Sequence, residues 1–135
     1  EPKGVKAEKS LLYNGADGSG STILNYGDFI AVLTYSKTCD GVICSVIIGE
    51  KGAVKIEKNS QYEGVTLLKD GQEKQIVDFS TKAELMSGEV NRFADYILNL
   101  SENREDYEKA SLLCLQVHKT MDLIKKDAGL IYPVK

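Results

Sequence analysis

The stretch YGDFIAVLTY, residues 26–35, decides how the fold is read. Its β-branched and aromatic residues, without a helical period, indicate a β-strand. Alternate side chains of a strand point to opposite faces. The two sets are Phe29, Ala31, Leu33 and Tyr35 on one face, and Ile30, Val32 and Thr34 on the other. Because an antiparallel strand usually turns one polar face to water, this doubly apolar strand predicts cover on both faces.

The first half of the chain carries further strand patterns around this stretch. The predicted strands are residues 5–13, 21–34, 41–48, 53–57, 65–69 and 75–79. Asp70-Gly71 between the last two is a strong β-hairpin signal. Since no helical period separates these segments, the sequence predicts an open, mainly antiparallel sheet of about six strands.

The second half of the chain changes to a helical period. Thr81-Lys-Ala-Glu84 has the form of a capping box and predicts the start of a helix that ends near residue 100. Residues 101–105 break the apolar pattern, with Asn103 as the predicted N-cap of a second helix over residues 106–127. Strands followed by helices predict the α+β class, with both C-terminal helices packed on one face of the sheet.

Two helices cover only one face of such a sheet, so the other face needs a further domain or subunit. An exposed apolar patch of this size usually marks an interaction surface. We therefore expect a homo-oligomer formed through the open sheet face. The predicted interface residues are Phe29, Ile30, Val32, Val42, Cys44 and Val46.

Composition excludes several classes of protein. The 135 residues fit one domain, and a net charge of −3 without a basic stripe predicts binding to neither nucleic acid nor anionic membranes. No apolar run reaches the roughly 18 residues of a membrane span. The three cysteines lack Cys-x-x-Cys spacing, which indicates reduced thiols in a cytoplasmic protein and no metal site.

The search for chemistry finds no catalytic centre. Residues 15–22 (GADGSGST) lack the Lys of a phosphate loop and precede a strand, so they indicate a hairpin turn. Cys114 and His118 have the spacing of a nucleophilic pair, but a mid-helix thiol lacks the field that lowers a thiol pKa. Candidate substrate-binding residues are Tyr35, Lys37 and Thr38, polar groups where the long strand enters a loop.

The chain resembles the C-terminal domain of the Gfo/Idh/MocA family of NAD(P)-dependent oxidoreductases. The resemblance is carried, in order, by EPKGVKAEK (1–9), NGADGSGSTILNYGDFIAVLTYSKT (14–38), IIGEKGAVKIEK (47–58) and KKDAGLIYP (125–133). It implies an open, largely antiparallel sheet, a subunit interface on the exposed sheet face, and an N-terminal Rossmann domain outside this chain. It also implies a full-length enzyme that oxidises a sugar, cyclitol or related polyol with NAD or NADP.

The family's glycine-rich fingerprint, its Glu-Lys-Pro segment and its Asp-x-x-x-His helix are absent from this sequence. No family catalytic residue is therefore assigned here, and residues 1–135 alone are expected to bind no cofactor and to be inactive. The opening Glu1-Pro2-Lys3, without Met, indicates a processed chain or a fragment. Two alternatives stay open: a stand-alone ligand-binding or dimerisation module, and a small thiol hydrolase that uses Cys114 and His118.

Overall fold

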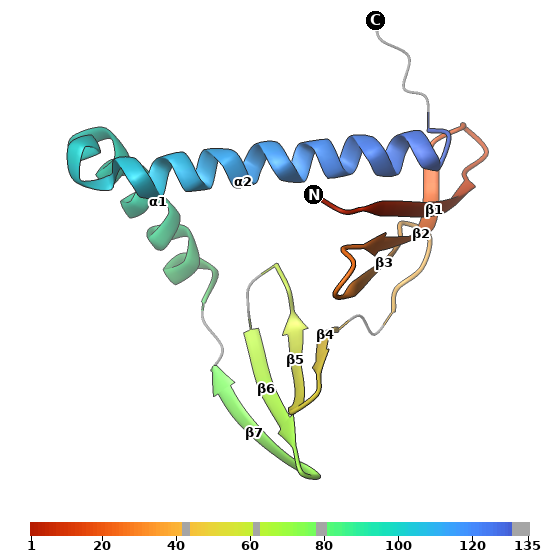
Figure 1. The fold of residues 1–135 in the computed structure, drawn as a ribbon, viewed down its shortest axis with the longest axis horizontal. Coiled ribbons are helices and arrows are strands. Elements are labelled where there is room, and N and C mark those ends of the chain that lie inside the picture. Colours follow the sequence, from red (N-terminus) through yellow and green to blue (C-terminus); the bar gives the residue numbers. More distant parts are fainter. Residues whose placement is uncertain (42–43, 61–62, 78–80, 131–135) are drawn as a thin grey trace, which may run out of the picture. The chain divides into compact units, whose positions relative to one another are not determined.

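A computed structural model describes residues 1–41, 44–60, 63–77 and 81–130, and confirms the α+β class (Figure 1). Seven strands precede two helices, and the strands form two antiparallel sheets instead of the single predicted sheet. The chain divides into two compact units. The first contains Glu1–Asp40 and the described residues from Glu105 onward, and the second contains Gly41–Arg104.

The first unit contains β1 (Gly4–Leu11), β2 (Asp17–Asn25) and β3 (Ile30–Ser36), hydrogen-bonded in that order. The long strand predicted over residues 21–34 is therefore wrong: it is two strands joined by a tight turn. Gly27 in this turn has a φ of 97°, and its N–H donates to the Asn25 side chain at 2.7 Å. The turn closes where the Tyr26 N–H donates to the Phe29 carbonyl at 3.0 Å. This extra turn accounts for seven strands where about six were predicted.

α2 (Leu100–Asp127) lies over part of one face of the β1–β3 sheet. Ala7, Thr22 and Leu24 on this face are buried. Leu24 and Leu33 share an apolar groove with α2, lined on the helix side by Leu113, Val117, Met121 and Ile124. The Asp127 carboxylate also accepts the Ala7 N–H of β1 at 2.7 Å. The helix therefore buries part of one sheet face and satisfies a backbone donor on the free edge of β1.

The opposite face of this sheet carries apolar side chains that no described element of the first unit covers. The register places Ile23 beside Val32, and Asn25 beside Ile30, on this face. Ile30 and Val32 are 64% and 65% exposed. The prediction that the helices leave one face open therefore holds within the first unit. We call this surface, which carries Ile23, Ile30 and Val32, the uncovered face.

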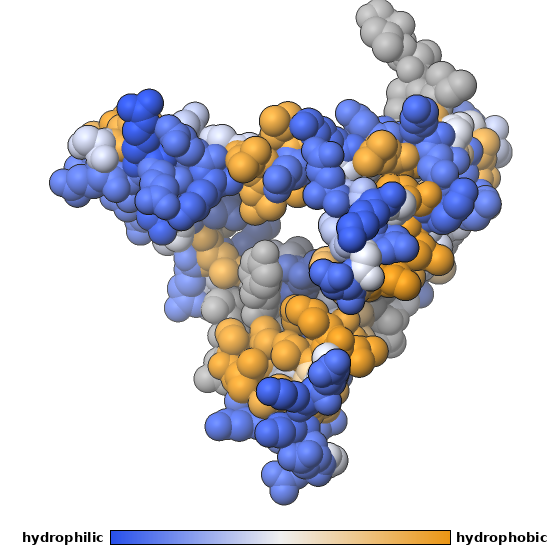
Figure 2. All heavy atoms as spheres, viewed as in Figure 1, coloured by the Kyte–Doolittle hydropathy of each residue, from blue (hydrophilic) through white to orange (hydrophobic). Residues whose placement is uncertain are grey.

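The second unit contains β4 (Ser45–Gly49), β5 (Gly52–Lys58), β6 (Glu63–Lys69) and β7 (Gln72–Val77), paired in sequence order, and α1 (Lys82–Leu98). The predicted Asp70-Gly71 hairpin is confirmed, because both residues have positive φ (52° and 74°) and Lys69 pairs with Gln72. Hydrophobic side chains gather over this sheet in Figure 2. The register aligns Val54 with Leu67, and Ile56 with Val65, on one of its faces.

The two helices meet at Asn99, which caps the C-terminus of α1. The predicted break over residues 101–105 is wrong, because α2 begins at Leu100 and continues through them. This segment contains neither Gly nor Pro, and Glu102 and Glu105 favour the helical conformation. Among the described residues, neither helix combines the length and the apolar character needed to cross a bilayer.

The predicted capping box of α1 is confirmed. The Thr81 hydroxyl accepts the Glu84 N–H at 3.3 Å, and the Glu84 carboxylate accepts the Thr81 N–H at 2.7 Å. The Thr81 N–H, and then the Thr81 hydroxyl, lower the pKa of Glu84 below its ordinary value of 4.5. The ionised carboxylate thus satisfies a backbone donor that the helix itself leaves unpaired.

Thr81→Ala is expected to lower the free energy of unfolding by about 1 kcal/mol. Urea denaturation followed by circular dichroism measures this loss, and Thr81→Ser should retain most of the stability. Because the folded pKa of Glu84 is lowered, its contribution is complete above pH 4.5 and is lost as pH falls through the lowered pKa. The stability difference between wild type and Glu84→Gln should therefore shrink well below pH 4.5; a constant difference would contradict this role.

Candidate functional site

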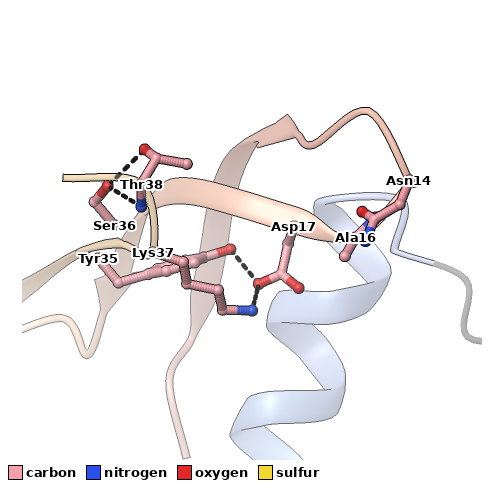
Figure 3. Close-up of polar contacts among 7 residues, drawn as sticks. All are labelled: Asn14, Ala16, Asp17, Tyr35, Ser36, Lys37 and Thr38. Carbon is pink, nitrogen blue, oxygen red and sulfur yellow. Dashed lines mark hydrogen bonds and ion pairs between the residues drawn. The ribbon is translucent and has the colours of Figure 1, made fainter.

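The three predicted substrate-binding residues lie at the end of β3, in the first unit (Figure 3). Tyr35 belongs to the strand, and Lys37 and Thr38 follow it. Their contacts separate them: Tyr35 and Lys37 both reach Asp17, whereas Thr38 bonds to Ser36. The contacts differ because successive side chains of an extended chain point to opposite sides.

Asp17 is the shared partner of Tyr35 and Lys37. Its Oδ2 accepts the Tyr35 hydroxyl at 2.9 Å and forms an ion pair with the Lys37 ammonium at 2.9 Å. The ammonium also lies 5.9 Å from the centre of the Tyr35 ring. The Asp17 side chain is 14% exposed and the Lys37 side chain 54%. We call these three residues the Asp17 cluster.

The backbone of β2 brings Asp17 into this position. β2 begins at Asp17, four residues before the predicted start of the strand. In the preceding turn, the Asn14 side chain accepts a hydrogen bond from the Ala16 N–H. Gly20 pairs with Tyr35, and the Tyr35 ring lies across it in the space that a Cβ would fill. The Lys37 N–H then donates to the Gly18 carbonyl at 2.7 Å.

Asp17 is the site residue that the sequence analysis missed. Residues 15–22 were interpreted as a hairpin turn, because the three glycines at positions 15, 18 and 20 favour a turn. Asp17 reaches the face of Tyr35 because the β1–β2 register shifts between Ser10 and Leu11, so that Leu11 pairs with Asp17; unbroken alternation from Ser19 would turn it to the other face.

Asp17 remains ionised at neutral pH. The hydrogen bond from Lys37, followed by that from Tyr35, lowers the Asp17 pKa below its ordinary value of 3.8. The cluster therefore combines one cation, one anion and one phenol, with no net charge. Such a set donates to and accepts from hydroxyl groups, and it suits a neutral, hydroxyl-rich ligand better than a highly charged one.

Thr38 belongs to a second polar group on the other side of the chain. Its hydroxyl lies 3.1 Å from that of Ser36, which also lies 3.3 Å from the Cys39 sulfur. These residues border a shallow depression rich in hydroxyl side chains, which are Ser10, Ser19, Ser21, Thr34, Ser36 and Thr38. Tyr35 also lines this depression, so Thr38 lies outside the Asp17 cluster but shares a surface with Tyr35.

The predicted interface residues are divided between the two units. Ile30 and Val32 lie on the uncovered face, whereas Phe29 lies in the β2–β3 turn and stacks on Tyr26 with ring centres 4.5 Å apart. The assignment of Phe29 to a strand face is therefore wrong. Val46 belongs to β4 and Cys44 precedes it, both in the second unit, and Val42 lies outside the described residues.

The other chemical candidates gain no geometric support. Cys114 and His118 are both exposed on α2, and no hydrogen bond joins their side chains within the described part of the chain. In residues 1–41, 44–60, 63–77 and 81–130, no three His, Cys, Asp or Glu side chains form a group that could hold a metal ion. Gly15–Gly20 leads into β2 and not into a helix, so it lacks the strand–loop–helix geometry of a dinucleotide site.

Comparison with known proteins gives two matches over almost the whole chain. It is 32% identical over 133 residues to the uncharacterized oxidoreductase YgjR of Escherichia coli K12, covering 98% of this chain and 39% of that protein. It is 31% identical over 134 residues to the scyllo-inositol 2-dehydrogenase (NADP(+)) IolU of Bacillus subtilis 168, covering 98% and 40%. Both relatives are oxidoreductases. The chain spans about two-fifths of their length, and no protein-family profile matches it.

Proposed function

We propose that this chain is the C-terminal part of an oxidoreductase of the Gfo/Idh/MocA family that acts on a cyclitol or a related polyol. The observation that carries the proposal is the similarity to two oxidoreductases along 98% of the chain. One of them is named as a scyllo-inositol 2-dehydrogenase that uses NADP(+). The resemblance of residues 1–9, 14–38, 47–58 and 125–133 to this family supports the same assignment.

The nicotinamide cofactor, NAD or NADP, belongs in this proposal to the part of the longer protein outside residues 1–135. The described residues do not fit a dinucleotide: the glycine-rich segment enters a strand, and the helices begin after Thr81 and Asn99 without a glycine-rich loop. A dinucleotide pyrophosphate is usually held by backbone N–H groups where such a loop opens a helix. In this proposal, hydride transfer is carried out by residues of the longer protein outside residues 1–135.

The Asp17 cluster is our candidate for the polyol contact that this chain supplies. Its charges cancel, and its ammonium, carboxylate and phenol are the donors and acceptors that a hydroxylated ring requires. The exposed half of the Lys37 side chain leaves this cation accessible to a ligand. Thr38, on the other side of the chain, is assigned to the hydroxyl-rich depression and not to the same contact.

The uncovered face is our candidate for a homo-oligomer interface. Ile30 and Val32 are about two-thirds exposed, and β3 has no charged residue between Ile30 and Ser36. The charged residues of this face, Lys6 and Glu8, lie at its β1 edge. Burying such an apolar surface against a second copy stabilises an assembly, by roughly 25 cal/mol per Å² of apolar area removed from water. The opposite sheet face is unavailable for this purpose where α2 packs against it.

The direct test is the activity of the longer protein that contains this chain. Purified protein is assayed for reduction of NADP+ and of NAD+ in the presence of scyllo-inositol, other inositols and simple sugars. We expect reduction that depends on at least one cyclitol and saturates with its concentration. Absence of reduction with the whole set, by protein shown to be folded, would refute the proposed reaction.

A further inference from the structure

The Asp17 carboxylate holds both side chains that are proposed to contact the polyol. A single oxygen, Oδ2, lies 2.9 Å from the Tyr35 hydroxyl and 2.9 Å from the Lys37 ammonium. The acceptor is sheltered, at 14% exposure, while the cation it holds is more than half exposed. The carboxylate is therefore less accessible to solvent, and to a ligand, than the ammonium that it holds.

The surroundings of Asp17 fix its own position. It is the first residue of β2, and the adjacent Gly18 carbonyl accepts the Lys37 N–H at 2.7 Å. The Tyr35 ring is held across Gly20, where a Cβ would approach it to 2.8 Å. A lysine at a strand exit would otherwise sample many rotamers, and a ligand would have to order it at an entropic cost.

We propose that Asp17 is a positioning residue of the polyol contact site, which keeps the Lys37 ammonium and the Tyr35 hydroxyl side by side before the ligand arrives. The inference rests on the proposed function, since it assigns the ligand of these two groups as a polyol. Asp17 acts through Tyr35 and Lys37 and takes no part in hydride transfer. Its removal should therefore weaken polyol binding while leaving the chemical step and the cofactor site intact.

The test uses the full-length enzyme with scyllo-inositol and NADP+ as probes. Asp17→Asn, which keeps the shape and removes the charge, is expected to raise KM for the inositol about tenfold. The values of kcat and of KM for NADP+ should stay within about twofold of wild type. Asp17→Glu keeps the charge but displaces the carboxylate, so it should raise KM for the inositol by only about threefold. Asp28→Asn in the exposed β2–β3 turn is the matched control and should change nothing.

The outcomes separate the inference from the function on which it rests. If Tyr35→Phe and Lys37→Met raise KM for the inositol but Asp17→Asn does not, the positioning role is wrong and the contact site stands. If none of the three variants raises this KM, the contact site is wrong as well. A wild-type enzyme without dehydrogenase activity would overturn the proposed function and this inference together.

A purely structural role would give a different pattern. It would lower Tm and kcat together with the affinity for both substrates, and that result would overturn the positioning role. If Asp17→Asn does not fold, judged by circular dichroism, Asp17→Glu replaces it as the test. Because a longer side chain displaces the carboxylate, we then expect KM for the inositol to rise about threefold with kcat unchanged; an unchanged KM would overturn the inference.

Discussion

Val32→Asp is expected to abolish self-association through the uncovered face. Val32 is 65% exposed in the single chain, and its register partner Ile23 lies beside it on the same face. A carboxylate at this position would be buried without a partner in a face-to-face assembly. The dissociation constant should therefore rise at least about a hundredfold, which corresponds to about 2.7 kcal/mol. Sedimentation velocity over a range of protein concentrations measures the change.

The matched control introduces the same charge in place of an exposed side chain outside the uncovered face. Tyr13 is fully exposed in the β1–β2 turn, so Tyr13→Asp should leave the dissociation constant unchanged. Both variants should retain the wild-type circular dichroism spectrum, because neither side chain is buried in the single chain. If Val32→Asp associates as tightly as wild type, the uncovered face is not the interface.

Gly20→Ala is expected to destabilise the first unit and to displace Tyr35 from Asp17. A Cβ at Gly20 would lie 2.8 Å from the Glu8 carbonyl oxygen and 2.8 Å from the Tyr35 ring. The backbone of Glu8 is held in the β1–β2 ladder and cannot move aside, so the ring or the strand must shift. Overpacking of this kind usually costs about 1–3 kcal/mol. Urea denaturation measures the stability, and KM for the inositol reports the position of Tyr35.

Gly4→Ala is the control for the loss of a glycine from this sheet. A Cβ at Gly4 would meet only the Asn25 side chain, at an ordinary contact distance of 3.8 Å. Replacing glycine in a strand also lowers the entropy of the unfolded chain, so this variant should be neutral or slightly more stable. Equal stability of the Gly20→Ala and wild-type proteins would mean that the close packing of Gly20 and Tyr35 is not required.

The features predicted correctly are those encoded by neighbouring residues. The Thr81–Glu84 capping box and the Asp70-Gly71 turn each depend on a few adjacent positions, and both form as expected. The turn at Gly27 was missed because apolar residues flank it on both sides, which made residues 21–34 look continuous. The start of α2 at Leu100 was missed because the apolar period weakens there, although helix propensity does not.

The candidate site was only partly predictable, because its geometry depends on strand register. Tyr35 and Lys37 were recognised from their place at a strand exit, but their partner Asp17 lies 18 and 20 positions earlier in the chain. The three residues meet because the β1–β2 register shifts between Ser10 and Leu11, which turns Asp17 to the face of Tyr35. Thr38 bonds to Ser36 and not to Asp17, so it lies outside the cluster although it is close to Tyr35 in sequence.

Cofactor binding tests most directly the proposal that this chain supplies polyol contacts and an interface but no cofactor site. NADP+ and NAD+ are titrated calorimetrically into the full-length protein and, in parallel, into residues 1–135 shown to be folded by circular dichroism. We predict saturable binding of at least one dinucleotide to the full-length protein and none to residues 1–135. Saturable binding to residues 1–135, or the absence of binding to the full-length protein, would contradict the proposal.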